Sequence, residues 1–162
     1  MANELTAQAA LDPFGRGLFL DDCGDLVFER NRDGLLDLRP SNGVGNLAQG
    51  LRITVATPLG TDIFNQLFGF DLLSIMRAGY PVSITKQLIR LHTVRTITGD
   101  DRVLRVEELA FDDEPAFTQL HPDADPDALR RQRKVTRRWQ LDVLIQPIAG
   151  RPVAVPVQVA GV

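Results

Sequence analysis

The C-terminal end of the chain alternates strictly between valine and small or polar residues. The valines are Val153, Val155, Val157 and Val159, and a period of two is typical of a strand with one apolar face. Pro156 lies in the middle of this pattern and has no N–H to donate, so we predict that the strand lies at a sheet edge. Proteins usually protect such edges because an open edge can pair with another chain.

Two further stretches have the pattern of strands. Residues 101–111 carry apolar side chains on both sides of a predicted strand. Residues 135–148 place most of theirs on one face: Val135, Trp139, Leu141, Val143 and Ile145. A turn at residues 149–152 would join this stretch to the final strand as a hairpin. The second half of the chain therefore predicts an antiparallel sheet whose last strand is an edge.

The middle of the chain has helical spacing instead. Leu47, Leu51 and Val55 recur at i, i+4 and i+8 after Asn46, a favourable N-cap residue. Thr57 and Pro58 suit the start of a further helix. Residues 59–76 then predict two short helices, broken at Gly69. The aromatic and leucine residues of this region are predicted to be core: Phe64, Leu67, Phe68, Phe70 and Leu72.

A longer helix is predicted at residues 84–98, with Ser83 as its N-cap and Gly99 at its C-terminal end. Its buried stripe is predicted to be Ile84, Leu88, Leu91 and Val94.

The remaining segments complete an α+β fold: an N-terminal hairpin and several short helices, followed by the antiparallel sheet. Residues 18–30 predict the hairpin, and residues 31–45 predict a loop. Residues 1–17 are predicted to be a flexible arm, and residues 18–162 a single domain. Within that domain, residues 112–134 form a charged insert in which acids precede a cluster of bases.

Composition limits the functions to consider. The chain has 162 residues, a net charge of −3, one cysteine (Cys23) and two histidines, His92 and His121. No intramolecular disulfide can form, no metal-ligand spacing stands out, and no cofactor is expected. The absence of a long apolar run and of a signal-peptide pattern predicts synthesis in the cytosol and no membrane insertion.

A series of motifs then appears in a characteristic order. They are Asn46-Leu47, Gln49, Thr57-Pro58-Leu59-Gly60, Phe64 and Phe68-Gly69, followed by Asp100-Asp101-Arg102 before a strand. This order resembles the small baseplate wedge proteins of contractile phage tails and related injection machines, a family often labelled "lysozyme-like". The family often has Glu-Pro-Arg where this chain has Asp100-Asp101-Arg102, so the acid and the arginine are kept and the rigid proline is lost. The resemblance covers about residues 22–160 and is weak in the charged insert.

The resemblance implies a structural, non-enzymatic protein that acts as a sheath initiator. Its partners would be the sheath protein, the helical bundle of the baseplate wedge, and tube or hub proteins, in a symmetric assembly of many copies. Arms of the first sheath ring would add to its sheet by β-strand addition, at the final strand or at its neighbour, residues 138–146. The implied partner-binding residues are Asp100, Asp101, Arg102, Val153, Val155 and Val157. The protein would be cytoplasmic during assembly and then part of the particle.

Two alternatives from other classes remain open. A peptidoglycan-cleaving glycoside hydrolase needs two positioned carboxyl groups, but the adjacent Glu107 and Glu108 point to opposite faces of a predicted strand. A nucleic-acid-binding module would use the bases of residues 130–138, yet six nearby acids offset their charge. The sequence therefore favours the structural role.

Overall fold

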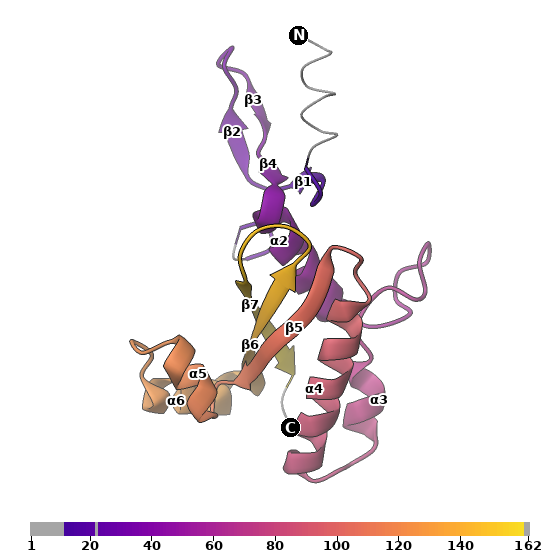
Figure 1. The fold of residues 1–162 in the computed structure, drawn as a ribbon, viewed down its shortest axis with the longest axis vertical. Coiled ribbons are helices and arrows are strands. Elements are labelled where there is room, and N and C mark those ends of the chain that lie inside the picture. Colours follow the sequence, from indigo (N-terminus) through magenta and orange to yellow (C-terminus); the bar gives the residue numbers. More distant parts are fainter. Residues whose placement is uncertain (1–11, 22, 161–162) are drawn as a thin grey trace. The chain divides into compact units, whose positions relative to one another are not determined.

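A computed structural model describes residues 12–21 and 23–160 and has the predicted α+β fold (Figure 1). The chain divides into two compact units, residues 1–50 and 51–162. The boundary falls inside helix α2 (Gly43–Ala56).

The first unit contains two short antiparallel pairs. Strand β1 (Arg16–Leu18) pairs with β4 (Pro40–Asn42), and β2 (Phe28–Arg30) pairs with β3 (Leu36–Leu38). The prediction of a loop over residues 31–45 is therefore wrong. Asn31 accounts for the second pair, because its side chain accepts hydrogen bonds from the N–H groups of Asp33 and Leu35 and closes the turn.

The predicted N-terminal hairpin is present as an isolated bridge between Leu20 and Leu26. Its turn is closed by Asp21, whose carboxylate accepts from the backbone N–H groups of Cys23 and Asp25. Residues 12–17 of the predicted flexible arm are folded, since Phe14 is buried and β1 is paired. Residues 1–11 of that arm lie outside the described residues.

Helix α2 buries Leu47, Leu51 and Val55, as predicted. However, the helix begins at Gly43, three residues before the predicted N-cap Asn46. The Asn46 side chain instead donates to the Phe14 carbonyl at 3.0 Å. Within the same unit the Gln49 side chain accepts from the Leu20 N–H and donates to the Leu18 carbonyl. These two amides fix the N-terminal strand to the helix.

The second unit is built on a three-stranded sheet of order β5-β6-β7. Its strands are β5 (Val103–Phe111), β6 (Arg138–Pro147) and β7 (Val153–Ala160), all antiparallel. Helices α3 (Leu72–Arg77) and α4 (Val82–Thr98) precede the sheet in the chain, and α5 (Pro115–Leu120) and α6 (Pro126–Thr136) connect β5 to β6. Helix α4 contacts β5 and lies alongside it in Figure 1.

One face of the sheet forms the core of this unit. The alternate residues of β6 and β7 on that face are buried: Trp139, Leu141, Val143, Ile145, Val155, Val157 and Val159. The predicted apolar face of Trp139, Leu141, Val143 and Ile145 is therefore confirmed. Val135, which was predicted on the same face, instead lies in α6 and is 84% exposed. The opposite face of β6 holds Asp142, a buried carboxylate that contacts the ring Nε2 of His121, just after α5.

The predicted buried stripe of α4 is wrong, because none of its four residues is fully buried. The buried residues are Thr85, Ile89, Thr93 and Ile97, whereas Ile84 and Leu91 are exposed. The Thr85 hydroxyl donates to the Tyr80 carbonyl, whereas the buried Thr93 hydroxyl has no hydrogen-bond partner among the described residues. The observed rotation of α4 places Lys86 and Arg90 next to the buried stripe, where they contact acids at the end of β5.

The segment between α2 and α3 is a loop, so the predicted helix starting at Thr57-Pro58 is wrong. Pro58 and Phe70 form a parallel bridge that closes the loop, and only α3 follows. Phe70 is buried as predicted, but Phe64 and Leu67 are 91% and 90% exposed and do not belong to the core. The Asp62 side chain accepts from the N–H groups of Phe64 and Asn65, a local bond that competes with helix formation.

Candidate functional site

The hydrogen-bond pattern of the sheet shows which backbone groups face outward. The Asp112 N–H donates to the Gln140 carbonyl at 2.9 Å, one step beyond the Phe111–Leu141 pair. Bonded and non-bonded pairs alternate in an antiparallel ladder. The even-numbered residues of β6 from 140 to 144 therefore bond to β5, and its odd-numbered residues bond to β7.

This alternation identifies the outward-facing groups of β7. Val155 and Val157 pair with Val143 and Leu141, so their N–H and C=O groups bond to β6. The corresponding groups of Ala154, Pro156 and Gln158 point to the outer edge. Pro156 fits this assignment, because a residue without an N–H is tolerated where that N–H would have faced away from the sheet.

The outer edge of β7 is regular and unpaired within the described residues. The register from Arg138–Ala160 to Ile145–Val153 has no bulge. Within residues 12–21 and 23–160, β7 pairs with β6 alone. Between residues 154 and 158 it offers two outward donors, on Ala154 and Gln158, and an outward acceptor on each of Ala154, Pro156 and Gln158.

The valines predicted to bind a partner do not face outward. The side chains of Val155 and Val157 are buried and that of Val153 is half-buried. Their backbone groups also belong to the β6–β7 ladder. Any partner strand at this edge would therefore contact Ala154, Pro156 and Gln158, none of which is among the predicted partner-binding residues.

The opposite edge of the sheet, β5, is obstructed. By the same alternation, the backbone N–H and C=O groups of Leu109 and Phe111 point to the outer edge of β5. The Phe111 N–H, however, donates to the Glu114 carboxylate at 3.0 Å. Arg90 of α4 holds that carboxylate with two bonds of 2.8 Å. The β5 register is also interrupted twice, between residues 103 and 105 and between 106 and 108, and bulges discourage edge pairing.

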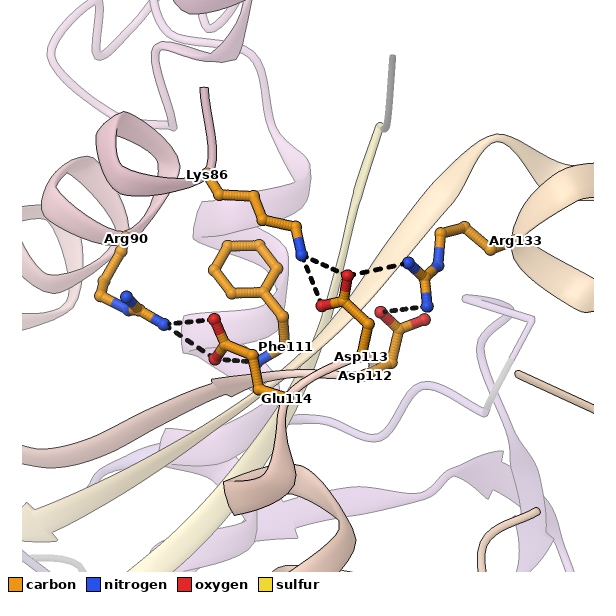
Figure 2. A network of polar contacts seen from close by, with 7 residues as sticks. All are labelled: Lys86, Arg90, Phe111, Asp112, Asp113, Glu114 and Arg133. Carbon is orange, nitrogen blue, oxygen red and sulfur yellow. Dashed lines mark hydrogen bonds and ion pairs between the residues drawn. The ribbon is translucent and has the colours of Figure 1, made fainter. Parts of the chain in front are cut away.

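Glu114 belongs to a wider network of ion pairs at the end of β5 (Figure 2). Lys86 of α4 contacts Asp113, and Arg133 of α6 contacts Asp113 at 3.1 Å and Asp112 at 3.4 Å. The Lys86 ammonium also lies 5.1 Å from the centre of the Phe111 ring. The network thus joins two helices to the strand between them.

Burial and charge act differently on the two aspartates. Burial raises the pKa of the Asp112 carboxyl, and the positive charge of Arg133 offsets this effect only in part. Burial also acts to raise the pKa of Asp113, but the hydrogen bonds and charges of Lys86 and Arg133 outweigh it and lower that pKa. Asp113 is therefore the carboxylate whose charge stabilises the network.

A small recess lies beside this network, with a volume of about 30 Å³. It is lined by Asp112, Arg133, Trp139, Gln140 and Gln158, among others. This volume holds one or two water molecules and is too small for a sugar ring. The recess therefore offers no substrate cleft.

The Asp100-Asp101-Arg102 motif forms a local fork between α4 and β5. Arg102 donates from Nε and Nη2 to the two carboxylate oxygens of Asp100, at 2.9 and 2.7 Å. These bonds lower the pKa of Asp100, against the opposing effect of burial, and raise the pKa of Arg102. Asp101 is exposed. The motif places a fixed guanidinium at the surface, about one-third exposed.

The charged insert pairs its own charges, as predicted. Arg130 and Arg131 contact Asp127 and Asp125, respectively, and Arg133 contacts the two acids at the end of β5.

In the part of the chain that the structure describes, no group of three or more His, Cys, Asp or Glu side chains is placed to hold a metal ion. None of the described helices is both long enough and apolar enough to cross a membrane.

The loop of residues 59–69 depends on Gly69 at its closing bridge. Gly69 has φ +114°, and a Cβ there would lie 2.6 Å from the Thr57 carbonyl oxygen and 3.0 Å from the Leu59 N. We expect Gly69→Ala to cost at least about 2 kcal/mol of unfolding free energy through strain and this clash. Urea unfolding followed by Trp139 fluorescence measures the cost. Gly60→Ala is the control, because Gly60 has φ +80° but no backbone atom nearer than 4.0 Å, and a similar loss there would contradict the steric argument.

Comparisons with known proteins identify no family for this chain. No family model matches it, and no curated protein matches it.

Proposed function

We propose that this protein is a structural baseplate component of a contractile injection system, such as a phage tail or a phage-tail-like particle. It joins the baseplate wedge to the first sheath ring by accepting a strand of the sheath protein. The observation that carries the proposal is the regular outer edge of β7, unpaired within the described residues. The order of the sequence motifs supplies the identity of the partner.

The acceptor edge in this proposal is β7. The alternative at residues 138–146 is wrong, because these residues form most of β6, which is paired on both sides. The edge of β5 is disfavoured by Glu114, which occupies the Phe111 N–H, and by two interruptions in its register. Carbonyl groups of an incoming strand at β7 would accept from the N–H groups of Ala154 and Gln158. At Pro156 the incoming strand would find no N–H donor. Main-chain bonds of this kind supply affinity in β-strand addition.

Arg102 is proposed as a second contact, to the wedge or the sheath. Its pair with Asp100 is partly exposed, so we expect Arg102→Ala to cost no more than about 1 kcal/mol of stability. The same change should prevent assembly of contractile particles, because a guanidinium desolvated at a protein contact is worth roughly 2–5 kcal/mol. Electron microscopy of particles from the variant, with circular dichroism of the purified protein, measures both. Normal particles would remove Arg102 from the proposal.

Two observations test the proposal as a whole. We expect genes for sheath, tube and wedge proteins next to the gene for this chain, and we expect the purified protein to bind the purified sheath subunit. A protein that cleaves peptidoglycan, with activity lost in Glu107→Gln or Glu108→Gln, would instead be a hydrolase. Tight DNA binding that weakens steeply with added salt would indicate a nucleic-acid-binding module.

A further inference from the structure

Three bases at the end of α6 and the start of β6 have no acid paired with them. Lys134, Arg137 and Arg138, the basic cluster, are exposed, and their side chains form no ion pair or hydrogen bond with another described residue. The other three bases of α6 each contact at least one acid. We infer that the strand that adds to the outer edge of β7 carries acidic side chains at the end nearest the basic cluster. The inference rests on the function proposed above and specifies the chemistry of the incoming strand.

The basic cluster lies beside the C-terminal end of the β7 edge. Arg138 is the first residue of β6 and pairs with Ala160, the last residue of β7. Arg138 and Thr136 of α6 also line the same recess as Gln158, whose backbone groups face the outer edge. The end of α6 and the end of the unpaired edge are therefore neighbours.

An acid opposite residue 160 on the incoming strand would be within reach of Arg138. Residues directly opposite one another in a sheet have side chains on the same face, so this acid would continue the row that begins at Arg138. Neighbouring strands lie about 4.8 Å apart, which puts the two Cα atoms roughly 10 Å apart across β7. An arginine and a glutamate side chain together span that distance. Lys134 and Arg137 add positive potential at the same end of the sheet.

The same charges disfavour a second copy of the chain as the occupant of the edge. Arg151 lies two residues before β7 begins, is exposed, and contacts no acid among the residues described. Two β7 edges paired antiparallel would bring the basic cluster of each copy next to Arg151 of the other. Two edges paired in parallel would bring the two clusters together. Because like charges oppose both arrangements, the bases protect the edge from self-pairing and attract an acidic strand.

The basic cluster is too small to favour nucleic acid. Three bases neutralise about three phosphates, whereas proteins that bind DNA tightly through its backbone make on the order of 6–10 such contacts. The chain as a whole also carries a net charge of −3, which opposes a polyanion. An acidic protein strand needs only the local charge, because main-chain bonds at β7 supply affinity as well.

The test is a charge-reversal variant, Lys134→Glu with Arg138→Glu, measured against the purified sheath subunit by biolayer interferometry. At low salt we expect it to bind at least about tenfold more weakly than the unmodified chain, mainly through slower association, because charges at the rim of an interface act chiefly on the association rate. In about 1 M NaCl the difference should shrink below about threefold, since salt screens exposed charges. The neutral variant, Lys134→Gln with Arg138→Gln, makes a smaller change and should lose at least about threefold in affinity at low salt.

The matched control is Arg105→Glu with Arg151→Glu, which changes the net charge equally at the other end of the sheet. Arg105 pairs with Gln146 near the turn between β6 and β7, and Arg151 lies in that turn. Both side chains are exposed, and the affinity of this control should stay within about threefold of that of the unmodified chain. An equal loss in the control would show that net charge alone is responsible and would overturn the inference.

The remaining outcomes separate this inference from the proposed function. Unchanged sheath binding by the charge-reversal and neutral variants at low salt would overturn the inference and leave β7 as the acceptor edge. Absence of sheath binding by the unmodified chain, or full binding by a variant with proline at positions 154 and 158, would overturn the proposed function and the inference with it. Binding of a short DNA duplex that is lost in the charge-reversal variant would assign the basic cluster to nucleic acid and overturn the inference as well.

Discussion

The double variant Ala154→Pro and Gln158→Pro is expected to bind the sheath subunit at least about thirtyfold more weakly than the unmodified chain. The two changes remove the outward donors on either side of Pro156. Each hydrogen bond is worth about 1 kcal/mol, and about 1.4 kcal/mol corresponds to a tenfold change in affinity. The carbonyl groups of the incoming strand would then be buried without a donor, which would weaken binding further. Biolayer interferometry with the purified sheath subunit measures the affinity.

The fold should survive this double change. The N–H groups of both residues point away from β6, so the β6–β7 ladder keeps all its bonds. Both side chains are exposed, and we expect the unfolding free energy to change by less than about 1 kcal/mol for each site. By contrast, Val157→Pro removes an N–H that bonds to β6 and a buried side chain, and should destabilise the second unit strongly.

A matched control separates the backbone from the side chains. The double variant Ala154→Thr and Gln158→Thr changes the same two side chains but keeps both N–H groups, and threonine is favourable in a strand. Its affinity for the sheath subunit should equal that of the unmodified chain. Loss of binding in the threonine variant would mean that the side chains make the contact. Full binding by the double-proline variant would show that β7 is not the acceptor edge.

The sequence contained more information on this edge than its alternation of valines. Pro156 has no N–H, so its own position in the pattern indicates that even-numbered residues face outward. The proline predicts an edge, whereas the family resemblance implies the valines as contacts. Their side chains are instead buried in the core. The edge itself was predictable because it depends on local periodicity and on one proline.

Two other features depended on contacts that periodicity does not reveal. In α4 the sequence pattern favours leucine and isoleucine as the buried stripe, yet Thr85 and Thr93 are buried in the structure. Lys86 and Arg90 beside them contact acids more than 20 residues further along the chain. In the 59–69 loop, dense apolar residues suggested a helix, whereas Asp62 and Gly69 impose a turn-rich backbone. Neither outcome follows from the local pattern of apolar residues.

The ion-pair network at the end of β5 leads to the second large expected effect. Asp113→Asn is expected to lower the unfolding free energy at neutral pH by about 2 kcal/mol. The side chains of Lys86 and Arg133 are only 17% and 21% exposed, and the change leaves both cations with Asp112 as their shared anion. The stability of the second unit is read from Trp139, its buried and single tryptophan, in urea unfolding.

Asp112→Asn should have a much smaller effect, within about 0.5 kcal/mol of the unmodified chain. Burial raises the pKa of Asp112 in the folded protein, so its negative charge disfavours the folded state relative to the neutral form. An amide of the same shape removes that cost together with the attraction to Arg133. The two adjacent aspartates therefore form a matched pair with different expected outcomes.

The pH dependence distinguishes their roles. Because the folded pKa of Asp113 lies below its unfolded value, its contribution is fully present above the unfolded pKa of about 3.9 and is lost as pH falls through the folded pKa. The stability difference between the unmodified chain and Asp113→Asn should therefore be constant near neutral pH and shrink below about pH 4. For Asp112 the folded pKa is raised, so the cost of its charge is relieved as pH falls through that pKa. Equal losses for the two variants at neutral pH, or a difference for Asp113→Asn that grows on acidification, would contradict the assignment of Asp113 as the stabilising carboxylate.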